Sequence, residues 1–187
     1  MKIDITLPLT PEILRDPLGN PKNELSGHLG THFDVMEQSF PLDYTEREAV
    51  VFDVSGIRER EIIPADIDES KVKAGMFVAF YSGFMEEEPY GTARYYKEHP
   101  VLSLSLIELL LAKKVSIIGL DFAGVRRGKE HTPTDRRLAE QGVFVVENLF
   151  GLRPLLEAPS PFLMHTYPFR ALGLSGLPCR VIAEIYL

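Results

Sequence analysis

The stretch of residues 105–122 constrains the fold more than any other part of the sequence. Ser105 followed by Glu108 matches a capping box, and an apolar run with two lysines in its last turn completes a short helix. Residues 115–122 then form an apolar run typical of a buried strand. A helix followed directly by such a strand predicts a mixed α/β domain with a few flanking helices.

Other segments extend this pattern along the chain. Alternating or continuous apolar residues predict further strands at residues 3–7, 50–54, 62–63, 76–81, 143–149 and 181–185. Thr132 and Pro133 predict a helix start, with Asp135 as the capping-box acid, and Gly142 is placed to end that helix. The chain of 187 residues shows no repeat or linker, so we expect one domain over residues 1–187.

Composition excludes several classes of function. The net charge of −7 and the lack of clustered Lys and Arg argue against a nucleic-acid partner. No apolar run is long enough for a membrane span, and the N-terminus lacks the pattern of a signal peptide. The single cysteine, Cys179, forms no internal disulfide, which suits a reducing compartment. We therefore expect a cytoplasmic protein with no membrane partner.

The segment of residues 27–34 carries the clearest chemical signal. On a strand, residues 28, 30, 32 and 34 would share a face, which would place His28, His32 and Asp34 together. Two imidazoles and one carboxylate suit zinc, manganese or iron(II), and three protein ligands leave positions for water and substrate. The alternative is that the histidines only form hydrogen bonds and Asp34 caps a turn. Three candidate ligands in seven residues, interrupted by Gly-Thr, favour the metal.

Two other segments are candidates for the surroundings of this site. Residues 8–27 are rich in proline and glycine, which predicts a loop leading into the histidine segment, and such loops often lie over sites. Tyr90, Tyr95 and Tyr96 precede Pro100 on a polar segment. They either line a pocket for an aromatic or amphipathic substrate or pack half-buried against the core, which is the commoner arrangement.

The run His28-Leu29-Gly30-Thr31-His32-Phe33-Asp34 resembles the His-x-Gly-Thr-His-x-Asp signature of the metal-dependent cyclase family, which includes bacterial kynurenine formamidases and isatin hydrolases. Residues 169–180 resemble the family's Gly-x-x-Gly-x-Pro-x-Arg segment, so the resemblance covers nearly the whole chain. It implies a swivelling β/β/α architecture with a mixed sheet, assembled as a homodimer or homotetramer.

The resemblance also implies a larger set of metal ligands. The family has a histidine at the start of a helix and, twelve residues later, a metal-binding glutamate in a strand that ends in Glu-Asn-Leu. Glu147 matches the glutamate, and Asp135 stands where the histidine is usual. Asp135 is either an oxygen ligand that favours harder ions or only a helix cap, and His131 is a second candidate one helical turn earlier. The implied metal residues are His28, His32, Asp34, Asp135 and Glu147.

The sequence departs from the family after Asp34. Met36 stands where proline is usual, and Gln38 stands where the family has a third histidine that binds metal or acts as the acid/base of hydrolysis. Glutamine cannot shuttle a proton. If the chain is active, Gln38 would only orient water, and Glu147 or Asp34 would take the proton.

The resemblance implies a zinc- or manganese-dependent hydrolase of a small amide, formamide, lactam or ester, acting on C–N bonds other than peptide bonds. Its partner would be a small-molecule substrate. Two alternatives remain open. One is a non-catalytic homologue that binds a small ligand or a metal and has lost the catalytic histidine, and the other is a domain without metal.

Overall fold

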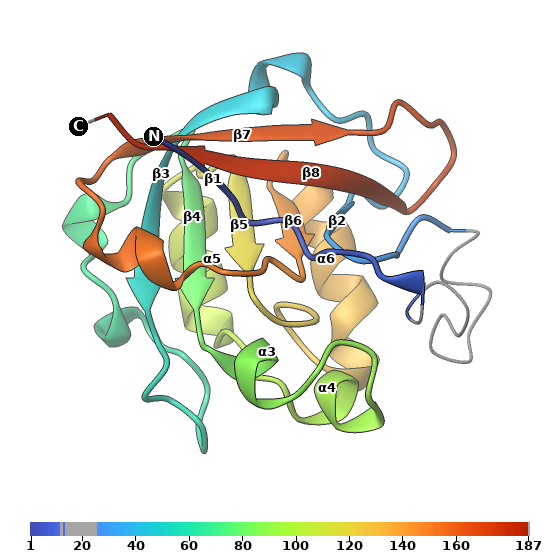
Figure 1. Ribbon diagram of the computed structural model, residues 1–187, viewed down its shortest axis with the longest axis horizontal. Helices are drawn as coiled ribbons and strands as arrows, with labels where there is room; N and C mark the ends of the chain where they lie inside the picture. The colour runs from blue at the N-terminus through green and yellow to red at the C-terminus, as the bar shows by residue number, and fades with distance from the viewer. Residues whose placement is uncertain (12, 14–25, 187) are drawn as a thin grey trace.

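A computed structural model describes residues 1–11, 13 and 26–186. Its strands form a mixed sheet in the order β1-β8-β2-β6-β5-β4-β3-β7, and β7 pairs again with β8. The sheet therefore closes into a barrel-like ring from β2 to β8, with β1 beside β8 (Figure 1). The strands are β1 (Lys2–Asp4), β2 (His32–Asp34), β3 (Glu46–Asp53), β4 (Phe77–Tyr81), β5 (Ile117–Leu120), β6 (Phe144–Glu147), β7 (Phe162–Pro168) and β8 (Gly176–Glu184).

Within the described residues, the helices are few and short. In Figure 1, α5 and α6 lie behind the sheet, and α3 and α4 lie at its lower end. The α-helices are α3 (Phe84–Glu87), α4 (Ala93–Glu98), α5 (Leu104–Ala112) and α6 (His131–Glu140). The 3-10 helices are η1 (Leu42–Thr45), η2 (Pro64–Asp66), η3 (Glu69–Lys71), η4 (Gly128–Glu130) and η5 (Arg153–Glu157). No helix within the described residues combines the length and apolar character needed to cross a membrane.

The central strands β3, β4, β5 and β6 are parallel, while β2, β7 and β8 join the sheet through antiparallel pairings. Helix α5 connects β4 to β5, and α6 connects β5 to β6, as parallel pairing requires. Successive residues of β4 enter different apolar clusters: Val78 and Phe80 join the cluster that contains α5, and Phe77 and Ala79 join the cluster inside the ring. Because both faces are covered, the parallel strands have continuous apolar runs.

The structure confirms the mixed α/β fold and the strands expected near residues 76–81, 115–122 and 143–149. Other expectations are wrong in detail. The run at 62–63 forms only an isolated bridge between Ile62 and Leu102. The strand expected at 50–54 begins earlier, since β3 starts at Glu46 and the alternation of its first residues places Glu46 and Glu48 on the exposed side. Helix α5 is capped by Ser103, and strand β7 has no counterpart among the predicted strands.

Gly119 is a closely packed position inside the ring. A Cβ atom at this position would lie 2.4 Å from Phe77 Cε1 and 2.8 Å from Leu149 Cδ1, and both neighbours are fully buried. We expect Gly119→Ala to lower the free energy of unfolding by about 1 to 3 kcal/mol through overpacking, measured by urea denaturation. Gly56→Ala, where a Cβ meets nothing within 4 Å, is the matched control and should change stability by less than about 0.5 kcal/mol. Equal stability of the two variants would contradict this reading of the core.

Candidate metal centre

Strand β2 fixes two of the predicted ligands. His32 and Asp34 lie on one face of the strand, and Phe33 points to the other face and into the core. His32 pairs with Glu147 across the antiparallel ladder to β6, so their side chains are direct neighbours. His32 Nε2 lies 3.6 Å from Glu147 Oε2 and 3.6 Å from Asp34 Oδ1.

His28 reaches the same place by a different route from the one predicted. Residues 28–31 are not a strand, and Gly30 has a φ of +60°, which bends the chain so that His28 folds back over β2. The two imidazole rings meet edge to face with their centroids 4.9 Å apart. His28 Nδ1 lies 3.1 Å from His32 Nε2 and 3.0 Å from Asp34 Oδ1. The shared strand face is wrong for His28, but the expected grouping of these three residues is present.

Helix α6 contributes two more groups. It begins at His131, directly after η4, so Thr132 lies inside the first turn, and Glu130 occupies the N-cap position. The prediction that Asp135 caps this helix is therefore wrong. His131 and Asp135 are one helical turn apart and point toward β6. His131 Nε2 lies 3.1 Å from Asp135 Oδ2 and 3.1 Å from Glu147 Oε1.

The cluster as a whole suits a divalent cation. All five residues implied as ligands come together, and His131 joins them. Ligand atoms lie within 4.8 Å of one another in two groups, His28 with His32 and Asp34, and Asp34 with His131 and Asp135. Both carboxylate oxygens of Asp34 and of Asp135 are buried without a hydrogen-bond partner. Buried carboxylates left in this way are costly, and imidazole nitrogen with carboxylate oxygen is the donor set of zinc and manganese sites.

The pKa shifts of the acidic and histidine side chains in the cluster also favour a bound cation. Burial opposes ionisation of Asp34, but its contacts with His28 and His32 outweigh burial and lower its pKa. Burial also opposes the charged form of His32, yet Asp34 and Glu147 raise its pKa to about 9. Burial and the charge of Asp34 hold the pKa values of Asp135 and Glu147 well above their ordinary ranges. Without an added positive charge, these two carboxyl groups therefore hold a proton more tightly than a carboxyl group in water.

In His28 and His32, the ring nitrogen that points away from the cluster contacts another polar group of the protein. His28 Nε2 lies 2.9 Å from Ser175 Oγ, and His32 Nδ1 lies 2.9 Å from the carbonyl oxygen of Gly30. Asn148 Nδ2 donates to that same carbonyl at 2.8 Å, and the Tyr95 hydroxyl donates to Asn148 Oδ1 at 2.7 Å. Such contacts fix ring orientation and tautomer, leaving Nδ1 of His28 and Nε2 of His32 directed into the cluster.

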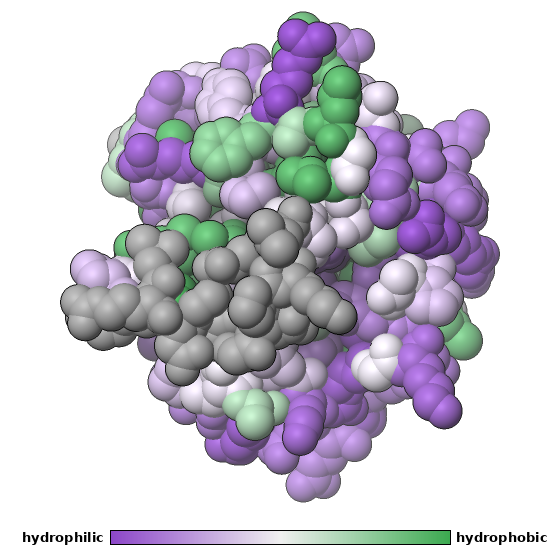
Figure 2. Space-filling view, turned by 90° about the vertical axis from the view of Figure 1, so that its right-hand side faces the viewer, coloured by the Kyte–Doolittle hydropathy of each residue, from purple (hydrophilic) through white to green (hydrophobic). Residues whose placement is uncertain are grey.

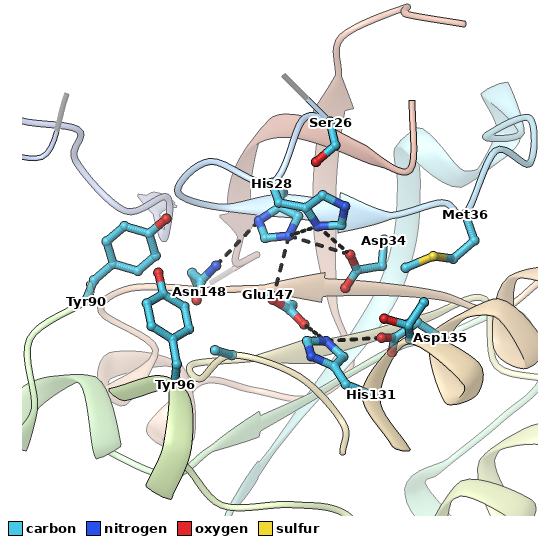
Figure 3. Close-up of a pocket in the computed structure, with 13 residues that line it drawn as sticks. Ser26, His28, Asp34, Met36, Tyr90, Tyr96, His131, Asp135, Glu147 and Asn148 are labelled. Carbon is cyan, nitrogen blue, oxygen red and sulfur yellow. Dashed lines mark hydrogen bonds and ion pairs between the residues drawn. The ribbon is translucent and has the colours of Figure 1, made fainter. Parts of the chain in front are cut away.

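An open pocket of about 320 Å³ lies against the cluster. Glu147 lies between His28 and His131 in Figure 3, and Tyr90 and Tyr96 stand on the opposite side from Asp135. The backbone N–H of Gly30 donates to the Tyr90 hydroxyl at 2.9 Å. Each of the two predicted arrangements of the tyrosines is therefore found. Tyr95 is fully buried in the core, whereas Tyr90 and Tyr96 line the pocket.

Some predicted features lie elsewhere. Gln38 has an exposed side chain and is not among the residues that line this pocket. Met36, at the position where the family has proline, does line the pocket. Most of the expected loop at residues 8–27 lies outside the described residues. The contact of Ser175 with His28 was not predicted, because it joins positions 147 residues apart and no local pattern signals it.

These pKa shifts predict how pH acts on the metal-free protein. The charge of His32 stabilises the fold fully below its ordinary pKa of 6.5, and this contribution is lost as the pH rises through about 9. The raised pKa values of Asp135 and Glu147 act in the same direction, since the folded protein holds their protons more tightly than the unfolded chain.

We expect the Tm of chelator-treated protein to fall between pH 6.5 and pH 9, the window set by His32, when followed by scanning calorimetry. Saturating zinc or manganese should flatten the curve, because a bound cation replaces the protons on the carboxyl groups. A Tm that rises over this window in the metal-free protein would contradict the assignment.

Ser175 offers a test of the support around His28. Ser175→Ala removes the contact to Nε2 but keeps the Ser175 carbonyl, which accepts the N–H groups of Val35 and Met36. We expect metal affinity, measured by competition with a chromogenic chelator, to fall by about 10- to 100-fold with the metal-free Tm unchanged. Ser55→Ala, which removes an exposed hydroxyl bonded to Asp53, is the control and should bind metal like the unaltered protein. Equal affinity in both variants would remove Ser175 from the support of the site.

Comparison with known proteins places this site in a family. The sequence model described as "Putative cyclase" matches residues 3–126. No curated protein matches the chain. Among solved structures, a predicted metal-dependent hydrolase from Bacillus stearothermophilus has a TM-score of 0.71 at 22% identity, covering 98% of this chain and 97% of that one.

Two isatin hydrolases also share the fold. Isatin hydrolase A from Labrenzia aggregata has a TM-score of 0.74 at 16% identity, covering 99% of this chain and 93% of the other. Isatin hydrolase A from Ralstonia solanacearum has a TM-score of 0.69 at 18% identity, covering 84% and 72%. At such identities the likeness establishes the fold alone. The sequence match, however, spans more than half of the chain, and the protein therefore belongs to the cyclase family that the His-x-Gly-Thr-His-x-Asp segment predicts.

Proposed function

We propose that the protein is a metal-dependent hydrolase of a small amide, formamide, lactam or ester, acting on C–N bonds other than peptide bonds. One observation carries the proposal: a buried cluster of imidazoles and carboxylates, with carboxylate oxygens that lack hydrogen-bond partners, opens into a pocket of about 320 Å³. That volume is at the lower end of small-molecule sites, which suits a small substrate.

Names of the similar structures support the choice of reaction. They include a metal-dependent hydrolase and isatin hydrolases. Tyr90 and Tyr96 give one wall of the pocket an aromatic surface with hydroxyl groups, which suits a planar substrate that carries hydrogen-bonding groups. An aryl formamide or a lactam fused to an aromatic ring has this character.

His28, His32 and Asp34 would hold the ion, together with Glu147 and Asp135. The ion, zinc or manganese, would supply Lewis-acid chemistry that polarises the substrate carbonyl and makes water more acidic. The protein contributes the geometry: Ser175 and the Gly30 carbonyl hold the outer nitrogens of the two histidines, so both rings are oriented before substrate arrives.

Glu147 is the group placed to move the proton. Its Oε2 faces His32 and its Oε1 faces His131 at the wall of the pocket, where a general acid/base could meet both water and substrate. Glu147 would take a proton from water as the oxygen adds to the carbonyl carbon, then give it to the nitrogen as the C–N bond breaks, leaving an acid and an amine. His131 Nε2, 3.1 Å from Glu147 Oε1, orients this carboxyl. Gln38, with its exposed side chain, has no part in this scheme.

The competing function is a non-catalytic homologue that binds a small ligand or a metal. The observation in its favour is the residue at position 38, where the family histidine is replaced by a glutamine that does not line the pocket. The two functions differ in one measurable respect, because a binding homologue keeps its ion but turns over no substrate.

We further propose a cytoplasmic homodimer or homotetramer without nucleic-acid or membrane partners. The net charge of −7 and the single, buried Cys179 support the location and the lack of a nucleic-acid partner. Self-association is supported by exposed apolar side chains on the loop between β7 and β8, where Phe169 is 71% and Leu172 is 89% exposed. Figure 2 shows apolar side chains gathered at the top of this side of the molecule.

Metal content and turnover together test the proposed function. We expect purified protein to carry zinc or manganese by elemental mass spectrometry, and His32→Ala and Asp34→Ala to lose it. Glu147→Gln should reduce kcat on N-formyl, lactam or ester substrates by about 100-fold or more, as expected for a general acid/base. His165→Ala is the matched control, because this buried histidine lies on β7 and pairs with Glu184.

The results separate the alternatives. A bound ion that depends on His32, with turnover of any substrate in the panel, supports the hydrolase. An ion without turnover supports the binding homologue. Failure to bind zinc or manganese at all would overturn both and leave the domain without metal.

A further inference from the structure

The turn that follows β2 has an uncommon backbone conformation. Met36 and Glu37 have φ values of +46° and +65°, and the N–H of Gln38 donates to the carbonyl of Val35 at 2.8 Å. Positive φ at both central residues is the pattern of a type I′ turn, which usually has glycine, asparagine or aspartate at these positions. A methionine in the left-handed region costs free energy, so the surrounding structure must hold it there.

Contacts on both sides hold this turn. The Ser175 carbonyl accepts the N–H of Val35 at 2.8 Å and the N–H of Met36 at 3.0 Å. At the surface, Arg136 of α6 donates to Glu37 Oε2 at 2.9 Å. Proline, which the resembled family has at position 36, has a φ fixed at about −65° and no N–H. Proline could neither adopt this conformation nor donate to Ser175, so the turn is a feature of this chain.

The turn presents residue 36 to the pocket and leaves residue 38 outside it. Met36 lines the pocket, whereas Gln38 is exposed and does not. The side chain of Met36 is 4% exposed and packs in the apolar cluster inside the ring, so packing keeps it in place. Figure 3 shows this side chain running toward Asp34 and Asp135.

The pocket therefore has two ends of different character. Tyr90 and Tyr96 form an aromatic wall on one side of the cluster, and Met36 lies on the other side (Figure 3). Among the described residues that line the pocket, Ala123 is the only other one with a purely apolar side chain. An amide carbonyl held at the cluster has an amine side and an acyl side. If a planar amine packs against the tyrosines, the acyl group extends toward Met36.

The end at Met36 suits a small, uncharged acyl group. A thioether is only a weak hydrogen-bond acceptor, so a polar group placed there would lose water without gaining a good partner. An anionic group would also meet the buried carboxyl groups of Asp34 and Asp135. A longer acyl chain would have to displace Met36 from the packed interior of the ring, and overpacking of this kind is unfavourable.

We propose that Met36 determines substrate specificity by limiting the acyl side of the substrate to a hydrogen atom or a short, uncharged chain such as methyl. This inference rests on the proposed hydrolase function and assigns the two ends of the pocket to the two sides of the amide. The strained backbone supports it, because residues in the left-handed region persist where the structure holds them, often at ligand sites.

Anilides that differ only in acyl length provide the test. Formanilide, acetanilide, propionanilide and butyranilide are given to the zinc-loaded protein. Their Kd values are measured by calorimetry, and kcat/KM is measured from release of aniline. In the unaltered protein, we expect butyranilide to be at least about tenfold poorer than acetanilide. Met36→Ala removes the three heavy atoms beyond Cβ and should bring the two anilides within about threefold of each other, since the added methylenes then have room.

Two further variants separate specificity from general loosening of the core. Met36→Leu is similar in volume and should keep the acyl-length preference of the unaltered protein. Met85→Ala removes the same atoms from a buried methionine of α3 that does not line the pocket, and it should also keep the preference. If Met36→Ala does not fold, Met36→Gly replaces it, because glycine adopts a φ of +46° without strain.

The outcomes distinguish this inference from the proposed function. Equal preference in the unaltered protein and in Met36→Ala would overturn the role of Met36, and release of aniline would leave the hydrolase standing. Anilides that bind with the expected preference but release no aniline would speak against hydrolysis and retain Met36 as the residue that selects the ligand. Failure of every anilide to bind or react would reject the assignment of Met36 to the acyl side.

Discussion

Repulsion among three buried carboxylates is the interaction on which the site depends. Asp34, Asp135 and Glu147 come from β2, α6 and β6, and each is almost fully buried. Ordinary proteins pair or hydrate such groups, and here the charged partners within reach are imidazoles. The opposite shifts in pKa, downward for Asp34 and upward for Asp135 and Glu147, are the signs of an arrangement prepared for added positive charge.

The fold supplies what this arrangement needs. A short strand such as β2 would be a weak support alone, but it lies between β6 and β8 and so has hydrogen-bonded neighbours on both sides. Ser175 contacts the chain on both sides of β2. Its carbonyl accepts the N–H groups of Val35 and Met36 after the strand, and its hydroxyl contacts His28 before the strand. Ligands on a supported strand keep their geometry better than ligands on a free loop.

Local sequence was sufficient for much of the architecture. The apolar runs at β4, β5 and β6 are continuous because both faces of these strands are covered, and this is a pattern that sequence displays directly. The segment from His28 to Asp34 was likewise enough to predict which residues gather and the family to which the chain belongs. Strand β7 and the charged start of β3 were not predictable in this way, since their strand form comes from pairing with each other and not from an apolar pattern.

Residue types and short spacings were enough to predict the mixed α/β class, the grouping of His28, His32 and Asp34, and the family. The folded chain was needed to show that Asp135 is buried in the site and not a helix cap, that His131 joins it, and that Gln38 lies outside the pocket. The physical reason is that ligand types and short spacings are local properties of a chain. Where α6 begins, and which of its faces meets β6, depends on how η4 and the loop around Gly124 pack against residues far away in the sequence.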